Sequence, residues 1–96
     1  MMVSDVLRSR REEILRIARR HGVGSIRVFG SFARGSAGEA SDLDLLIEVD
    51  GLTTAWFPDG LVAELDTLLG CRVHVVEPNA LRPEMCAHAL AEAIPL

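Results

Sequence analysis

The chain has 96 residues, of which 49% are apolar and 25% are charged, as is usual for a folded globular protein. This length suffices for one compact domain, so we expect residues 1–96 to form a single domain. The net charge of −4 argues against a general nucleic-acid-binding protein, which usually carries a basic excess. No signal peptide is evident, and no apolar run approaches the about 20 residues that a membrane span needs. The sequence therefore predicts a cytoplasmic protein that does not enter a membrane.

The two cysteines, Cys71 and Cys86, are too few for a disulfide framework, and we expect free, partly buried thiols. A domain of this size leaves some apolar surface exposed, which favours a homo-oligomer or a complex with another protein. Arginines crowd the N-terminal region, and such a helix face is most often solvated, although it also suits a phosphate or an acidic partner.

The first part of the chain predicts a helix followed by a strand. Residues 4–20 have the periodicity of a helix, with Ser4 as the N-cap and Gly22 as the stop. The apolar positions of this helix are Val6, Ile14, Ile17 and Ala18. Residues 25–30, SIRVFG, are β-branched and aromatic and end at glycine, which is typical of a strand. The polar, glycine-rich stretch that follows is long enough for one or two helical turns at its start.

Residues 42–50 alternate between apolar and polar side chains and predict a strand with two different faces. One face carries Leu43, Leu45, Ile47 and Val49. The other face is largely acidic and carries Asp42, Asp44, Leu46, Glu48 and Asp50.

Two helices and a strand complete the chain. Pro58 suits the first turn of a helix that ends at Gly70. The buried stripe of this helix is Leu61, Leu65, Leu68 and Leu69. Residues 71–77 read as a third strand, and a last helix begins near Pro83. The mixture of helices and strands predicts the α/β class, with one small sheet and helices packed against it.

Asp42 and Asp44 share one face of the predicted strand, about 7 Å apart at their Cα atoms. At this separation their oxygens can converge on one divalent cation. Oxygen ligands suit Mg²⁺ or Mn²⁺, and Mg²⁺ commonly joins one or two carboxylates to the phosphates of a substrate. The alternative for an isolated pair of this kind is a solvated acidic face.

The turn before this strand offers groups that bind phosphate. Gly30 and Ser31 end a strand and begin a short helix, where backbone N–H groups and a hydroxyl can hold a phosphate. Arg34 follows at a position from which its guanidinium can reach a phosphate or an acidic neighbour. Gly35 permits a close approach or an unusual backbone angle. A phosphate cradle, an arginine and metal-binding carboxylates together are the parts of phosphoryl or nucleotidyl transfer.

The stretch GSFARGSAGEASDLDLLIE resembles the signature of the DNA polymerase beta-type nucleotidyltransferase superfamily, which is Gly-Ser, ten intervening residues and Asp-x-Asp. The ARG after the Gly-Ser and the serine before the first aspartate are similar to the minimal nucleotidyltransferase (MNT) group, whose members consist of the catalytic domain alone. The later stretch LLGCRVHVVEPNALRP also looks like this group, so the resemblance covers nearly the whole chain.

The resemblance implies a polymerase beta palm-like α/β fold, a small mixed β-sheet flanked by helices. It implies that Gly30 and Ser31 hold the triphosphate of ATP or another NTP, and that Asp42 and Asp44 bind Mg²⁺. MNT proteins commonly occur beside HEPN-domain toxins, where they act as antitoxins and where transfer of AMP to the toxin is one mode of action.

One position departs from the superfamily pattern. A third carboxylate, on the next strand, normally helps to hold a second metal ion and activates the attacking hydroxyl. The matching stretch here is residues 73–76, so His74 stands at the expected carboxylate position and joins Asp42 and Asp44 as a catalytic candidate. Imidazole is a poor Mg²⁺ ligand but can act as a general base near neutral pH. Glu77 is three residues further on, hence on the opposite face, and is a poor substitute unless the strand ends at Val76.

The function predicted from these residues is transfer of NMP, most simply AMP, from Mg-NTP to a hydroxyl of a HEPN toxin. Two alternatives remain open. With His74 in place of the carboxylate, the protein is also compatible with a catalytically silent antitoxin that acts by binding its partner. The second alternative is a regulatory module that binds a nucleotide and does not catalyse transfer.

Several further residues have less specific interpretations. The residue types of a zinc site are present in Cys71, His74, Cys86 and His88. On a strand, however, the first two of these would face opposite sides, which disfavours a shared metal. His21 and His88 are expected at the surface or at its boundary. Trp56 and Phe57 are expected to cap the core, or to form a partner surface if they are exposed.

Overall fold

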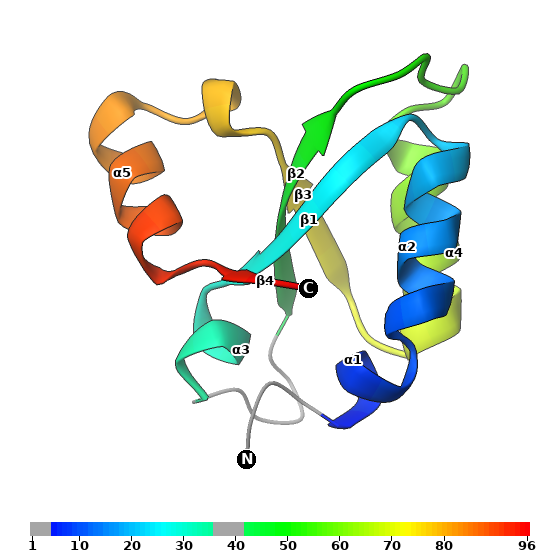
Figure 1. Ribbon diagram of the computed structural model, residues 1–96, viewed down its shortest axis with the longest axis horizontal. Coiled ribbons are helices and arrows are strands. Elements are labelled where there is room, and N and C mark those ends of the chain that lie inside the picture. Colours follow the sequence, from blue (N-terminus) through cyan, green and yellow to red (C-terminus); the bar gives the residue numbers. More distant parts are fainter. Residues whose placement is uncertain (1–4, 36–41) are drawn as a thin grey trace.

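The computed structural model describes residues 5–35 and 42–96, and Figure 1 shows how their helices and strands are arranged. The elements are α1 (Asp5–Ser9), α2 (Arg11–Arg20), β1 (Val23–Phe29), α3 (Ser31–Arg34), β2 (Leu43–Val49), α4 (Asp59–Leu69), β3 (Val73–Val76), the 3-10 helix η1 (Pro78–Ala80), α5 (Pro83–Glu92) and β4 (Ile94–Pro95).

The strands form one mixed sheet in the order β3-β2-β1-β4. β1 is antiparallel to both β2 and β4, whereas β2 and β3 are parallel. A parallel pair requires a crossover connection, and α4 provides it. The predicted fold, a small mixed sheet flanked by helices, is confirmed.

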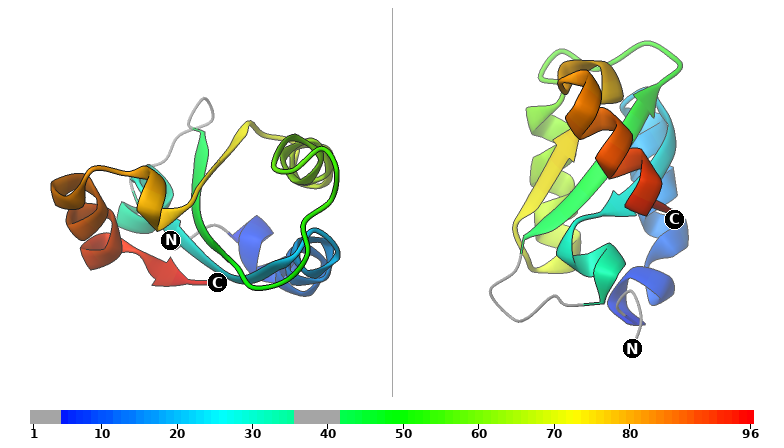
Figure 2. Two further views of the ribbon diagram at one scale, coloured as in Figure 1. Left: turned by 90° about the horizontal axis from the view of Figure 1, so that it is seen from above. Right: turned by 90° about the vertical axis from the view of Figure 1, so that its left-hand side faces the viewer.

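The hydrophobic core lies between the sheet and the helices α2 and α4, which cover one of its faces (Figure 2). The alternation predicted for β2 places Leu43, Leu45 and Ile47 in this core, where each is at most 1% exposed. α5 lies on the other side of the sheet (Figure 2). The core therefore packs against one face of β2, the strand that carries Asp44 and directly follows Asp42.

The second face of β2 is less open than its acidic pattern predicted. Leu46 lies on this face and is only 2% exposed, because η1 packs against β2 on the side where α5 lies. Leu46 thereby separates two polar positions of the face, Asp44 at the start of the strand, which is half-buried, and Glu48 near its end, which is exposed.

The two later helices begin and end close to the predicted positions. α4 follows Pro58 and ends at Gly70, whose φ of 70° is the left-handed conformation that favours glycine at a helix end. The side chains of Leu61 and Leu65 are fully buried, as the predicted stripe requires. α5 begins at Pro83.

The N-terminal helix differs from the prediction, because it is divided into α1 and α2. Arg10 separates the two helices with φ −105° and ψ 9°. The break redirects α1 so that Leu7, which is 2% exposed, joins the core beside Ile14. The predicted N-cap, Ser4, lies outside the described residues.

Two predictions about side-chain burial are wrong, namely the surface or boundary position of His21 and the core-capping position of Trp56. His21 is buried, with 6% exposed, because Nδ1 makes a hydrogen bond of 2.8 Å with Thr54 Oγ1 and Nε2 lies 3.4 Å from Glu64 Oε2. Trp56 is 79% exposed and does not cap the core, whereas Phe57 packs against it.

The last strand, β4, was not expected from the sequence. It has only two residues, one of them Pro95, which is tolerated because β4 lies at the edge of the sheet. The pairing continues at the C-terminus, where Leu96 N–H donates to Ile26 O at 3.1 Å and Arg11 Nε donates to Leu96 O at 2.7 Å.

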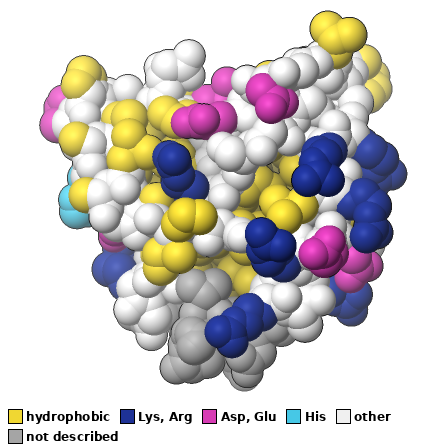
Figure 3. All heavy atoms as spheres, in the orientation of Figure 1, with side chains coloured by type: hydrophobic (Ala, Val, Ile, Leu, Met, Phe, Trp, Pro, Cys, Tyr) yellow, Lys and Arg dark blue, Asp and Glu magenta, His cyan; other side chains and the backbone are white. Residues whose placement is uncertain are grey.

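The surface of the molecule shows two contrasting regions in Figure 3. Arginine side chains gather over α2, and hydrophobic side chains gather over α5. Large exposed apolar side chains in and next to α5 are Met85, Leu90 and Ile94. Among the described residues, no helix is both long and apolar enough to span a membrane.

Core burial predicts different costs for two leucine truncations of the same size. We expect Leu65→Ala to lower the free energy of unfolding by about 2–5 kcal/mol, because it leaves a cavity at a fully buried site. Leu52→Ala removes the same atoms from a side chain that is 95% exposed and should change the free energy of unfolding by less than about 0.5 kcal/mol. Urea denaturation of both variants checks this, and equal losses would contradict the assignment of the core.

Candidate active site

The Gly30 turn joins the end of β1 to the start of α3. Gly30 has φ 75° and ψ −152°, a backbone conformation that is essentially restricted to glycine. A Cβ atom built on Gly30 would lie 2.5 Å from Asp44 Oδ2, closer than real Cβ contacts allow. Glycine is therefore required here twice, for its backbone angles and for the approach of the Asp44 carboxylate.

The register of the sheet brings the predicted site residues together across three strands. Phe29, the residue before Gly30, is the antiparallel partner of Asp44. Asp44 is in turn the parallel partner of His74 on β3. The turn, the second aspartate and the histidine thus lie side by side, although the last is encoded in a different part of the chain.

His74 contacts the first aspartate directly. Its Nε2 lies 2.9 Å from Asp42 Oδ2, and Arg72 Nε lies 3.8 Å from Asp42 Oδ1. One oxygen of Asp42 thus faces His74 on β3, and the other faces Arg72, the residue just before β3. Glu77, by contrast, follows Val76, which pairs with Leu46, so it lies farther along the sheet from Asp44.

The electrostatics of the site converge on Asp44. Burial raises the pKa of the Asp44 carboxyl above its ordinary value, and the negative charges of Asp42 and Glu92 act in the same direction. The charges of His74 and Arg34 oppose this rise in pKa. A carboxyl group with a raised pKa among several charged neighbours is typical of a functional site.

Glu92 is a site residue that the sequence analysis missed. Gly30 N–H donates to Glu92 Oε2 at 3.0 Å, and Arg34 Nη1 donates to Glu92 Oε1 at 3.0 Å. The hydrogen bond from Gly30 is the main cause that lowers the pKa of Glu92, and Arg34 adds to it. The only sequence signal is that Glu92 is the single acid within the apolar ending ALAEAIPL.

The remaining candidates of the loop lie in and after α3. Ser31 begins this helix and is half-buried, whereas the side chain of Arg34 is 54% exposed. Gly35 ends the helix with φ 77°, and a Cβ built on it would meet nothing within 4 Å. Residues 36–41 of the signature lie outside the described residues.

The chemistry of the donors fits one hard cation better than a zinc ion. Asp42 and Asp44 supply carboxylate oxygens, the ligands that Mg²⁺ and Mn²⁺ prefer. In residues 5–35 and 42–96, no group of three or more His, Cys, Asp or Glu side chains is arranged to hold a metal ion, so the four residues considered for zinc do not form one. Cys71 and Cys86 are both free and partly buried, as predicted.

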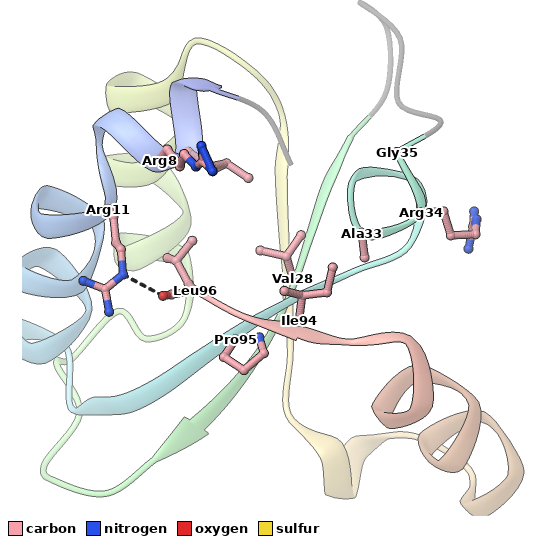
Figure 4. Close-up of a pocket in the computed structure, with 10 residues that line it drawn as sticks. Arg8, Arg11, Val28, Ala33, Arg34, Gly35, Ile94, Pro95 and Leu96 are labelled. Atoms are coloured by element: carbon pink, nitrogen blue, oxygen red, sulfur yellow. Dashed lines mark hydrogen bonds between the residues drawn. The ribbon is translucent and has the colours of Figure 1, made fainter. Parts of the chain in front are cut away.

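A cavity of about 520 Å³ opens next to the Gly30 loop (Figure 4). Its lining residues are Leu7, Arg8, Arg11, Val28, Ala33, Arg34, Gly35, Ile94, Pro95 and Leu96. In Figure 4 the side chain of Arg34 points away from Val28 and Ile94. Neither aspartate lines this cavity, so the candidate site lies beside it and not within it.

Comparison with known proteins shows the family of the chain. The profile that describes the nucleotidyltransferase domain matches residues 11–96. The chain belongs to the nucleotidyltransferase domain family. The predicted family and enzyme class, a nucleotidyltransferase, are thereby confirmed.

Two archaeal relatives of this nucleotidyltransferase are named as protein adenylyltransferases. The protein adenylyltransferase MntA of Thermococcus cleftensis is 32% identical over 92 residues, which are 96% of this chain and 90% of the relative. A protein of Methanocaldococcus jannaschii is 33% identical over 84 residues, which are 88% of this chain and 90% of the relative.

Solved structures share the fold of this nucleotidyltransferase. One that is assigned as a minimal nucleotidyltransferase has 45% sequence identity and a TM-score of 0.85, and the match covers 100% of this chain and 97% of the other. A toxin–antitoxin structure with AMP-PNP has a TM-score of 0.73 at 19% identity, over 88% of this chain and 69% of the other.

The contact between Gly30 and Asp44 predicts unequal effects of two alanine substitutions. Gly30→Ala and Gly35→Ala both place a side chain at a positive φ, which costs about 1–2 kcal/mol of stability. Only Gly30→Ala also forces Cβ against a carboxylate, so its loss should be larger by at least about 1 kcal/mol. Chemical denaturation measures both losses.

A double variant serves as the control for this contact. Adding Asp44→Ala to Gly30→Ala removes the obstructing carboxylate and should restore part of the lost stability. No recovery in the double variant, or equal losses in the two single variants, would show that Gly30 does not approach Asp44 as described.

Proposed function

We propose that this protein transfers an NMP, with AMP as the first candidate, from Mg-NTP to a hydroxyl group of a partner protein. The partner is a HEPN-type toxin, and the protein acts as its antitoxin in the cytoplasm. The observation that carries the proposal is the contact between the Gly30 turn and Asp44, an arrangement that suits a phosphate at the turn and a metal ion at the carboxylate. Relatives named as protein adenylyltransferases support the reaction, and the similar toxin–antitoxin structure supports the partner.

Each residue of the site has a role in this proposal. Gly30 and Ser31 hold the triphosphate of ATP or another NTP, and Gly30 contributes the close approach that its missing side chain allows, because its N–H already donates to Glu92. Arg34 stabilises the phosphates, with Gly35 ending the loop. Asp42 and Asp44 hold Mg²⁺, or Mn²⁺ in its place, together with phosphate oxygens. When bound, the metal ion offsets the negative charge of the phosphates.

His74 is proposed to accept the proton of the attacking hydroxyl. Its contact with Asp42 fixes the direction of the ring. If Nε2 carries the proton and donates it to Asp42, then Nδ1 of the neutral imidazole is unprotonated and can accept one. Replacement of a carboxylate by histidine therefore preserves a possible base while removing one negative charge.

A catalytically silent antitoxin is the second candidate. The observation that favours it is the same His74, since imidazole supplies neither the charge nor the oxygen ligands of the third carboxylate. In this alternative the protein neutralises the toxin by contact, and the site serves at most to bind a nucleotide.

The decisive experiment measures nucleotide transfer to the neighbouring gene product. The protein is incubated with that product and Mg-ATP, and the mass of the product is determined by mass spectrometry. We expect added AMP, and a loss of about two orders of magnitude or more in the rate with Asp42→Ala/Asp44→Ala. Absence of added mass, together with full neutralisation by the double variant, would favour the silent antitoxin. Tight binding of ATP without transfer would instead support the regulatory module.

His74→Asp tests the proposed position of the missing carboxylate. A third carboxylate next to Asp44 should tighten Mg²⁺ binding by about tenfold and make transfer more strongly dependent on Mg²⁺. Thr67→Asp adds the same group to an exposed position on α4 and serves as the control. Equal Mg²⁺ affinity in all three proteins, measured by titration calorimetry, would show that His74 does not occupy that position.

A further inference from the structure

We propose that Glu92 is a positioning residue for nucleotide binding, which holds the Gly30 turn and Arg34 in the arrangement that receives a triphosphate. The inference rests on the proposed function and extends it to the C-terminal segment, which the signature of the family does not include. It is carried by the two contacts of the Glu92 carboxylate, one with a backbone N–H and one with a guanidinium.

The sheet itself places Glu92 opposite the turn. Val28 pairs with Ile94 and Arg27 pairs with Pro95, so β4 runs antiparallel along the end of β1. Continuing this register by two residues brings Gly30 opposite Glu92, the last residue of α5. The pairing of β4 with β1 thus brings the backbone of Glu92 close to the turn, and the two contacts of its carboxylate hold the side chain there.

The turn is held from two directions. Glu92 accepts the hydrogen bond of Gly30 N–H on one side, and the carboxylate of Asp44 faces the Cα of Gly30 on the other. Glycine has the widest backbone freedom of all residues, so an unrestrained turn at this point would sample many directions. Restraining Gly30 also restrains Ser31, the next residue, relative to Asp44.

The contact with Glu92 orients the Arg34 guanidinium but engages only one of its nitrogens. A guanidinium carries several N–H donors, and only Nη1 contacts Glu92 Oε1. The side chain of Arg34 remains 54% exposed, whereas that of Glu92 is 19% exposed. Within residues 5–35 and 42–96, Glu92 is the acidic partner of Arg34, so the other N–H donors of Arg34 are available to a phosphate while Glu92 keeps the side chain beside the turn.

The opposite role is sequestration, in which Glu92 competes with a phosphate for Gly30 and Arg34. The two roles predict opposite changes in affinity. Removing the charge of a positioning carboxylate weakens nucleotide binding, whereas removing a competing carboxylate strengthens it. The sign of the change therefore decides between them.

The test is calorimetric titration of the full chain with Mg-ATP, which needs no partner protein. In Glu92→Gln we expect the Kd for Mg-ATP to rise about tenfold, the effect of losing one charge-assisted contact. Glu84→Gln changes an exposed glutamate in the first turn of the same helix and should leave the Kd unchanged. Adding Arg34→Ala to Glu92→Gln should weaken binding by less than the sum of the two single changes, because they share one contact.

Three results would overturn the inference. If the unaltered protein binds Mg-ATP and the Kd of Glu92→Gln is unchanged or lower, the positioning role of Glu92 is refuted. The proposed function is not affected by that result. A lower melting temperature with an unchanged Kd would assign Glu92 a purely structural role. No binding of Mg-ATP, Mg-GTP, Mg-CTP or Mg-UTP by the unaltered protein would refute the proposed function and the inference with it. If Glu92→Gln does not fold, Glu92→Asp retains the charge on a shorter side chain and should raise the Kd by a smaller factor.

Discussion

The close approach of the Gly30 backbone to the Asp44 carboxylate is the constraint on which the candidate site depends. It is possible only because β1 and β2 pair with Phe29 opposite Asp44 and because Gly30 has no side chain. The Gly-Ser turn and the Asp-x-Asp pair are therefore one structural unit, although ten residues separate them in sequence. A change of register between the two strands would separate them, since a shift of one residue turns every side chain of a strand to its other face.

The charges around this contact are balanced by residues from several elements. Asp42 faces His74 and Arg72 on the side of β3, and Glu92 faces Arg34 on the side of α5. Asp44 lies between these groups, and its burial and its negative neighbours raise its pKa. A carboxyl group whose pKa is raised in this way is common at functional sites.

The sequence was informative wherever local chemistry decides the structure. The alternation in β2 and the glycine stop at Gly70 each follow from a few neighbouring residues, and the fold class follows from their order. The errors arise from partners distant in sequence. His21 is buried because Thr54 and Glu64 surround it, and β4 forms because β1 offers it an edge. Neither neighbour can be read from a local pattern, and Glu92 was missed for the same reason.

The site lacks the carboxylate that the superfamily pattern has on β3. The positions of His74 and Glu92 indicate which residue can take over the function of that carboxylate. Glu92 supplies a further acid, but both of its oxygens are engaged, one by Gly30 N–H and the other by Arg34. It therefore supports the phosphate side of the site and does not replace the group missing beside Asp44. In the proposed reaction the proton-accepting task of the third carboxylate falls to His74, whose imidazole suits proton transfer better than binding of Mg²⁺. Metal binding and proton acceptance are thus divided in this proposal between two aspartates and one histidine.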